Sequence, residues 1–182
     1  VVSFTHADVI QIASGLMSVA VVDKQRRLEL KAKLSKFVFN TPFGKDLKRL
    51  LLAGIGVHYA GMLPRYRALV ERLARSGALG VICGTDTLGV GINVPLKSVL
   101  FTQLCKYDGI KTKTLGPRAF HQIAGRAGRK GYDTQGHVFA QAPPHVIENM
   151  RLKRKAEATG KKSSKVRLQK APERGYAHWD EA

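Results

Sequence analysis

Five short apolar runs, separated by longer amphipathic stretches, constrain the fold of this chain most strongly. Most of these runs are continuously apolar rather than alternating, which is the pattern of strands covered on both faces of a sheet. The runs are VVSF (1–4), IGVHY (55–59), GVIC (80–83), SVLFTQL (98–104) and GHVFAQA (136–142). Because strands alternate with helical stretches, the sequence predicts an α/β fold with a mostly parallel β-sheet flanked by helices.

The stretches between the apolar runs have the residue spacing of amphipathic helices. Thr5 is the predicted N-cap of a helix over 5–17, with Asp8 three residues later. Pro64 fits the first turn of a helix over 63–77, where a proline lacks no needed hydrogen bond. Further helices are predicted over 23–37 and 43–54, and from Pro117 onward.

The chain is strongly basic, with a formal net charge of +18 over 182 residues. This excess favours a polyanionic partner, of which nucleic acid is the commonest, although a basic protein without a specific anion has the same composition. Residues 1–150 hold 21 basic and 9 acidic residues, and residues 151–182 hold ten and four. We therefore predict a basic globular domain over 1–150, followed over 151–182 by a basic linker or the start of a further module.

Several kinds of site are not expected. Cys83 and Cys105 lie in apolar runs without a CxxC or Cys/His cluster, so no metal site is predicted. Buried free thiols fit a reducing, intracellular and cytoplasmic location. No apolar run approaches the roughly 18 residues of a transmembrane helix, and no membrane partner is expected. The chain opens within a predicted strand rather than at Met, which indicates a fragment of a longer polypeptide.

The polar run GTDTLGVGINVP (84–95) directly follows the predicted strand 80–83. In a parallel α/β sheet, ligands bind where loops leave the carboxyl ends of the strands. Glycines in this run let the backbone approach a ligand, and Thr85, Asp86 and Asn93 supply hydrogen-bonding groups. The alternative is an ordinary turn in which Asp and Thr cap the backbone. The run is not a P-loop, because the chain contains no GxxxxGK[ST] motif.

The stretch HQIAGRAGRKGYD (121–133) places Arg126 and Arg129 three residues apart within a predicted helical run. On a helix both guanidinium groups would lie on one side, where they could clamp phosphate oxygens. The glycines between them would remove side-chain bulk, at about 1 kcal/mol each in a helix interior. The alternatives are a disordered nucleic-acid-binding segment rich in Arg and Gly, or a solvated basic helix end.

Four segments in order resemble the superfamily-2 helicases. HQIAGRAGRKGYD is similar to motif VI (Q-x-x-G-R-x-G-R), and GTDTLGVGINVP is similar to motif V. GIGVHYAGMLPRYRALVERL (54–73) resembles the H-x-A-G-L segment between motifs IV and V. FTQLCKYDG (101–109), with the loop to Pro117, resembles the Ski-like DExH branch in particular. Two departures are Asp86, where Glu is usual, and Gly89, where Ala is common.

The resemblance implies the second RecA-like domain of a DExH helicase, with the match covering about residues 1–142. It implies that Arg126 and Arg129 are catalytic arginine fingers, which stabilise transition-state charge on a transferred phosphoryl group. The residues that it assigns to ATP binding are Gln122, Gly91 and Asn93. The residues that it assigns to the nucleic-acid strand are Thr85, His58, Gly61, Arg65 and Thr5.

The same resemblance implies the cofactors and partners. ATP and Mg²⁺ would be held by the first RecA-like domain of the same polypeptide, which carries the P-loop and the DExH box. The nucleic-acid partner would be a single strand of RNA or DNA, with RNA favoured by the segment 101–117. Alone, this chain is expected not to hydrolyse ATP. The alternative function is a non-catalytic nucleic-acid-binding module that retains the RecA-like fold.

Overall fold

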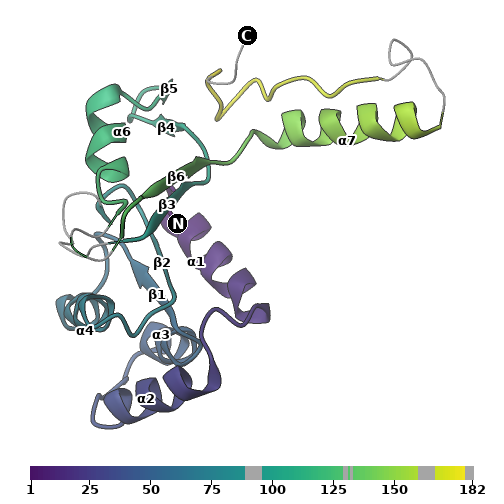
Figure 1. The fold of residues 1–182 in the computed structure, drawn as a ribbon. Coiled ribbons are helices and arrows are strands. Elements are labelled where there is room, and N and C mark those ends of the chain that lie inside the picture. Colours follow the sequence, from purple (N-terminus) through teal and green to yellow (C-terminus); the bar gives the residue numbers. More distant parts are fainter. Residues whose placement is uncertain (89–95, 129–130, 132, 160–166, 179–182) are drawn as a thin grey trace. The chain divides into compact units, whose positions relative to one another are not determined.

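The computed structural model describes residues 1–88, 96–128, 131, 133–159 and 167–178 (Figure 1). The chain divides into two compact units. The first unit comprises Val1–Phe101 and Pro117–Phe139, and the second comprises Thr102–Gly116 and Ala140–Ala182. Each unit is therefore built from two separated segments of the sequence.

The first unit contains most of the predicted elements. Its helices are α1 (His6–Gly15), the 3₁₀ turn η1 (Leu16–Ser18), α2 (Lys24–Leu34), α3 (Pro42–Leu52), α4 (Pro64–Arg75) and α6 (Pro117–Ala124). Its strands are β1 (Ile55–His58), β2 (Val81–Gly84), β3 (Ser98–Phe101) and β6 (His137–Ala140), whose last residue belongs to the second unit. The α/β fold class and the parallel pairing of β1 with β2 are confirmed.

The amino-terminal residues join the two pairs of strands. β1 pairs with β2 from Ile55↔Val81 to His58↔Gly84, and β3 is the neighbour of β6. Val2 forms parallel bridges to both Gly84 and Phe101. The predicted strand over 1–4 is thus reduced to a single bridging residue between β2 and β3, because only the backbone around Val2 is bonded on both sides.

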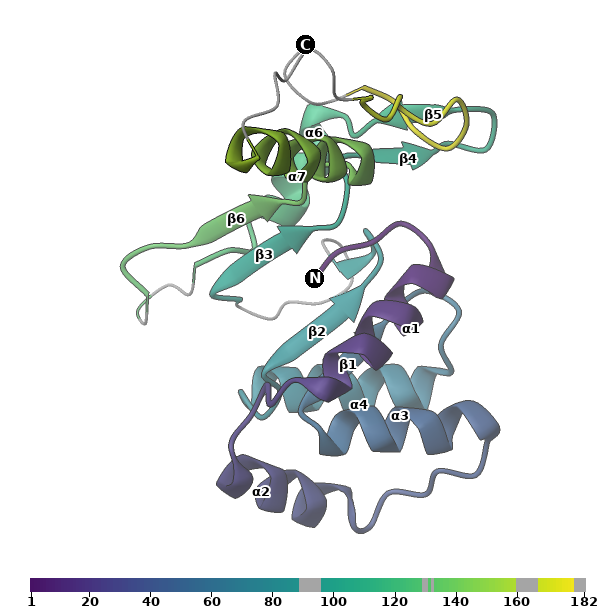
Figure 2. The ribbon, with the colours of Figure 1, turned by 90° about the vertical axis from the view of Figure 1, so that its right-hand side faces the viewer.

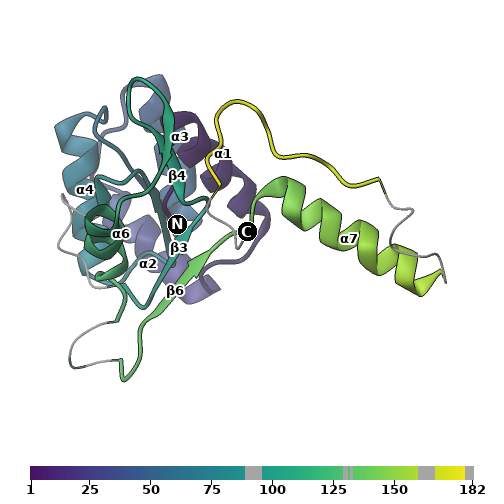
Figure 3. The same ribbon diagram turned by 90° about the horizontal axis from the view of Figure 1, so that it is seen from above.

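The core of the first unit lies around β1, which is fully buried as its continuous apolar pattern predicted. The helices α1 and α4 lie on opposite sides of β1 and β2 (Figures 1 and 2), and in the view from above they again lie apart (Figure 3). Their buried positions recur at helical spacing, as Val9 and Ala13 on α1 and Leu69, Val70 and Leu73 on α4 show. α3 adds Leu47, Leu50 and Leu51, and α2 adds Leu30 and Leu34. The predicted caps are present, because the Thr5 hydroxyl accepts the Asp8 N–H and Pro64 begins α4.

The helix that was predicted to carry both arginines ends before either of them. α6 stops at Ala124, and Arg126 lies in the turn that follows. The prediction of a helical i, i+3 pair is therefore wrong. A helix could not in any case continue through Gly128, because Gly128 has a φ of +90°, and a Cβ on Gly136 would lie 2.6 Å from the Gly128 nitrogen. The glycines allow two backbone segments to touch, rather than clearing space along a helix.

The second unit differs from the sequence prediction. The predicted strand 98–104 ends at Phe101, and a separate hairpin follows, formed by β4 (Cys105–Tyr107) and β5 (Thr112–Thr114) in antiparallel pairing. Asp108 starts the turn by accepting the N–H groups of Ile110 and Lys111, each at 2.9 Å. These bonds and Lys113 hold the pKa of the Asp108 carboxyl well below its usual range.

The second unit also contains α7 (Pro144–Ala158), which the sequence analysis did not predict and which crosses the expected boundary at residue 150. The segment 167–178 returns along this helix. Asn149 accepts the Gln169 N–H at 2.7 Å and donates to the Gln169 carbonyl oxygen at 2.9 Å. The rings of His145 and Tyr176 meet edge to face with centroids 5.1 Å apart. These contacts give part of the expected linker a fixed conformation.

Candidate nucleotide and nucleic-acid interface

The carboxyl ends of three neighbouring segments of the first unit meet at one edge of the sheet. His58 ends β1, Thr85 follows β2, and Thr5 lies three residues beyond the bridge at Val2. The Thr85 N–H donates to the His58 carbonyl oxygen at 3.2 Å. The ring of His6, next to Thr5, packs against Tyr59 with centroids 4.5 Å apart. The structure therefore brings together segments that the sequence analysis assigned separately to strand binding.

His58 is a buried residue, with 2% of its surface exposed. Its Nε2 atom lies 3.2 Å from the Glu71 Oε1 atom on α4, and its Nδ1 atom has no hydrogen-bond partner among the described residues. Burial lowers the pKa of His58, and the hydrogen bond and charge of Glu71 oppose that shift. In this conformation the imidazole fixes the end of β1 to α4 rather than facing solvent.

Thr85 and Thr5 use their hydroxyl groups within the protein. Thr85 is 5% exposed, and its Oγ1 atom lies 2.9 Å from the Thr87 Oγ1 atom. The exposed Thr5 caps α1, and its own hydroxyl donates to the Asp8 carboxylate at 2.6 Å. Asp86, one of the family departures, is half-buried in the turn after β2 and has an interaction partner.

Gly61 and Arg65 lie on the exposed side of the same edge. Gly61 follows Tyr59, and a Cβ on it would approach the His6 ring at 3.5 Å. The Arg65 guanidinium donates to Asn40 and to the Tyr66 hydroxyl, the latter at 3.0 Å, and lies 4.7 Å from the centroid of the Tyr66 ring. These contacts hold the exposed guanidinium against the first turn of α4.

The segments after motif V and within motif VI are joined by backbone hydrogen bonds. Leu96 donates to the Arg126 carbonyl oxygen at 3.2 Å and accepts the Gly128 N–H at 2.7 Å. Arg126 is half-buried, whereas Gln122 is exposed on α6. α6 is anchored to β3 through stacked rings of Phe120 and Phe101, with centroids 5.1 Å apart. Arg129, Gly91 and Asn93 lie outside the described residues.

A hollow of the first unit lies elsewhere. It has a volume of about 580 Å³ and is lined by residues at the amino ends of β2 and β3, including Val81 and Ser98. Of the predicted site residues that the structure describes, none lines it. Within the described part of the chain, no cluster of His, Cys, Asp and Glu could hold a metal ion, and both cysteines are free and buried.

Sequence reasoning did not identify two residues that support this edge. Glu71 contacts His58, which is 13 positions earlier in the sequence. In the sequence alone, Glu71 cannot be distinguished from the other charged residues of the amphipathic helix α4. Tyr59 reads as part of an apolar run, although its ring packs against that of His6 outside the core strands. The sequence signal for Tyr59 was its position directly after a buried strand and two residues before Gly61.

Comparison with curated proteins identifies helicases as relatives. The chain is 40% identical to the DExH-box ATP-dependent RNA helicase DExH11 of Arabidopsis thaliana, over 63% of this chain and 8% of that protein. It is 32% identical to the Superkiller complex protein 2 of Mus musculus, over 85% of this chain and 13% of that protein. It is 40% identical to the probable helicase HelY of Mycobacterium tuberculosis, over 53% and 11%. The chain thus spans only about a tenth of the length of these relatives.

Two family matches divide the sequence. Residues 142–182, which include α7 and the returning segment, match a family described as a domain of unknown function (DUF3516). Residues 17–131 match the family described as the helicase conserved C-terminal domain, and this match covers well over half of the chain. None of the helices in the described ranges is long and apolar enough to cross a membrane. The chain belongs to the helicase conserved C-terminal domain family, in the superfamily-2 DExH group that includes Ski-like helicases.

Proposed function

We propose that this chain is the second motor domain of an ATP-dependent nucleic-acid helicase, with RNA as the favoured substrate. Membership of the family and the printed names of the relatives support a helicase. The observation that carries the proposal is the backbone pairing of Leu96 with the turn at Arg126, which ties the segment after motif V to motif VI. Motif VI, which would contact the nucleotide, and motif V, which would contact the nucleic-acid strand, can then move together.

In this proposal, Arg126 and Arg129 are arginine fingers that reach a nucleotide held by a companion domain. The placement of Arg126 supports this role, because it is half-buried in the turn after α6 and its backbone is hydrogen-bonded to Leu96. Gln122 lies four residues earlier on the exposed face of α6, where it could hydrogen-bond the same ligand. Gly91 and Asn93 of motif V complete the nucleotide contacts. Two such guanidinium groups bind phosphate oxygens without risk of deprotonation.

ATP and Mg²⁺ would be held mainly by the first RecA-like domain, and this chain would contribute hydrogen-bond donors for phosphate oxygens from its motif VI side chains. When bound, the nucleotide and its metal supply the phosphoryl group whose transfer drives the motor. The residues of this chain would bind the outer phosphate and stabilise its charge. We therefore expect the isolated chain not to hydrolyse ATP.

The nucleic-acid strand would cross the edge formed by Thr5, Gly61 and Thr85. Thr5 and Gly61 are exposed at this edge and suit contacts to phosphates, which position a strand without reading its sequence. Thr85 is buried, and its N–H group bonds the loop after β2 to the end of β1. His58 would act by fixing the end of β1 through Glu71, since its imidazole is buried. Arg65 would contribute a charged group from the first turn of α4. The remaining predicted property, a cytoplasmic location, is consistent with two reduced cysteines.

The decisive experiment replaces Arg129 with alanine in a polypeptide that contains both motor domains. We expect a loss of nucleic-acid-stimulated ATP hydrolysis of about 10³-fold or more, as for other arginine fingers, with ATP binding largely retained. Arg118→Ala is the matched control, because Arg118 is exposed at the start of α6 and outside the motif. If Arg129→Ala hydrolyses ATP as fast as an active Arg118→Ala variant, the assignment of Arg129 as an arginine finger is refuted.

A second candidate function is a non-catalytic nucleic-acid-binding module with the same fold. The basic charge of the chain supports binding without hydrolysis equally well. Retention of both motif arginines favours the motor, because binding of a strand alone does not require them. Detection of nucleic-acid binding but no stimulated ATPase in the two-domain polypeptide would favour this second candidate.

A further inference from the structure

The helix α7 of the second unit has one face covered by the returning segment. His145, Asn149 and Ala156 lie within one arc of the helix when residues advance by about 100°. His145 contacts Tyr176, Asn149 forms two hydrogen bonds with Gln169, and Ala156 is buried. This arc is the inward face of the helix, and it fixes the rotation of α7 within the unit.

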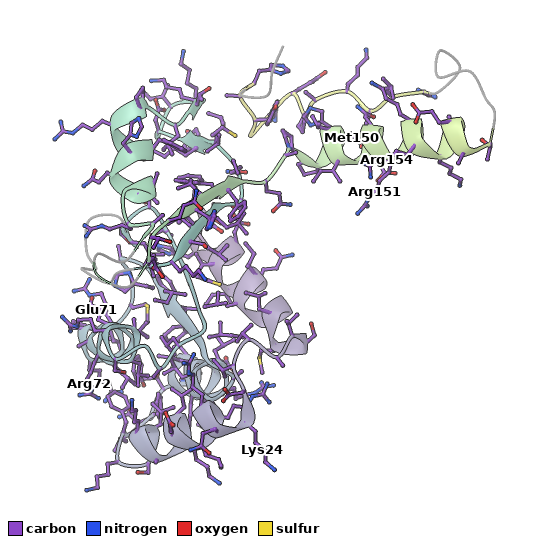
Figure 4. The ribbon with its side chains drawn as sticks, in the orientation of Figure 1. Lys24, Glu71, Arg72, Met150, Arg151 and Arg154 are labelled. Atoms are coloured by element: carbon purple, nitrogen blue, oxygen red, sulfur yellow. The ribbon has the colours of Figure 1, made fainter. Side chains whose placement is uncertain are left out.

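The opposite arc of α7, defined by Ile147, Met150, Arg151 and Arg154, is its outward face. Arg151 and Arg154 are exposed, and Met150 is 50% exposed (Figure 4). Figure 4 shows both arginine side chains on the side of the helix turned away from the returning segment. The two arginines are one helical turn apart, so their guanidinium groups can reach neighbouring acceptors.

The outward face is positively charged and is not neutralised from within the unit. Arg151 lies 3.7 Å from Glu148, but both side chains are largely exposed, and such pairs hold a guanidinium only weakly. No ion pair of Arg154 is found in the described ranges of the chain. The outward arc itself contains no carboxylate, although the exposed Glu157 lies about 20° beyond Met150 at its border. The returning segment adds three exposed basic residues, Arg167, Lys170 and Arg174, and one exposed acidic residue, Glu173.

We propose that the outward face of α7 is a second binding surface for a nucleic-acid strand, separate from the edge of the sheet. Arg151 and Arg154 would bind phosphates, and Met150 with Ile147 would contact a base or sugar between them. Over α7 and residues 167–178, Lys and Arg outnumber Asp and Glu by seven to three, and this excess favours a polyanionic strand as the partner. The inference rests on the proposed nucleic-acid function and adds a surface to it.

The test measures binding of a fluorescein-labelled single-stranded oligouridylate by anisotropy, using the 182-residue chain at several salt concentrations. Arg151→Ala with Arg154→Ala should lower the slope of log K against log salt by about 1.4, since each lost phosphate contact contributes about 0.7. At 0.1 M salt this corresponds to a loss of affinity of about tenfold or more. Alanine favours helices at least as well as arginine, so far-UV circular dichroism should not change.

The matched control is Arg72→Ala with Arg75→Ala, because these arginines are also exposed and three residues apart on a helix. We expect a clearly smaller change in affinity and slope for this pair. If both pairs weaken binding equally, only overall charge matters and the inference is wrong, while the proposed function stands. If the unmodified chain shows no salt-dependent binding, the nucleic-acid function itself fails. A dimer that only the α7 variant dissociates, with unchanged RNA affinity, would identify a second copy as the occupant and overturn the inference.

Discussion

Gly84 marks the point where β2, the bridge at Val2 and the end of β1 come closest, and its replacement by alanine is expected to strain all three. A Cβ at this position would lie 2.6 Å from the His58 carbonyl oxygen and would collide with the Leu88 side chain. Leu88 can change rotamer, but the backbone carbonyl can only move with its strand. Gly84 also donates to the Val1 carbonyl oxygen at 3.0 Å and accepts the Ser3 N–H at 2.9 Å.

The cost of Gly84→Ala follows from these contacts. Overpacking of a rigid site costs about 1–3 kcal/mol, and weakening one backbone hydrogen bond adds about 1 kcal/mol. We therefore expect the free energy of unfolding to fall by about 2–4 kcal/mol, or Tm by roughly 5–15 °C for a chain of this size. Urea titration followed by circular dichroism measures the change.

Gly15→Ala is the control, since a Cβ at Gly15 meets no atom within 4 Å and the residue ends α1. This variant should be as stable as the unmodified chain or gain up to about 1 kcal/mol from helix propensity. If the Gly84 and Gly15 variants unfold at equal urea midpoints, the strands around Gly84 accommodate a Cβ without loss of stability, and the expected steric cost at Gly84 is refuted.

Two further predictions concern His58 and the core. Burial lowers the pKa of His58 in the folded chain. At pH values between this lowered pKa and the ordinary histidine pKa of about 6.5, the unfolded chain therefore binds a proton that the folded chain does not. The free energy of unfolding should therefore decrease as the pH falls from 7 to 5. In urea titrations, His58→Gln should reduce this dependence on pH. If the dependence is unchanged, His58 is not its source. Leu47→Ala, at a fully buried position of α3, should lower the free energy of unfolding by about 2–5 kcal/mol. The control, Leu28→Ala on α2, should lower it far less, because Leu28 is 55% exposed. Equal losses of stability would contradict the assigned core.

The sequence predicted the elements that depend on local patterns. The continuous run at β1 and the helical spacing of α1 and α4 are strong periodic signals, and the caps at Thr5 and Pro64 mark their starts. The end of α6 was not predictable in this way, because Ala127 fits the apolar face of a longer helix. After α6 the backbone of Arg126 and Gly128 is hydrogen-bonded to Leu96, and Gly128 lies against Gly136; both contacts depend on residues that are distant in sequence or follow later.

The candidate site was predictable in composition but not in geometry. Motif spacing indicated His58 and Thr85, yet it did not indicate that His58 is buried against Glu71. Leu96 and Arg126 are 30 positions apart in the sequence, and Leu96 is an ordinary apolar residue, so no local signal exists for their pairing. The helix α7 was missed because its basic residues resemble those of a linker, and only the contacts with Gln169 and Tyr176 show which side is inward.

The bridge at Val2 has a consequence for folding during synthesis. Val2 donates to the Leu100 carbonyl oxygen, so residues 1–4 complete their pairing only after nearly a hundred further residues have been made. At ribosomal speeds of about 5–20 residues per second, this delay is of the order of 5–20 s. Until β3 emerges, Val1, Val2 and Phe4 have no strand beside them on that side of the sheet. The emergence of β3, rather than that of β1 and β2, therefore sets the earliest time at which this part of the core can close.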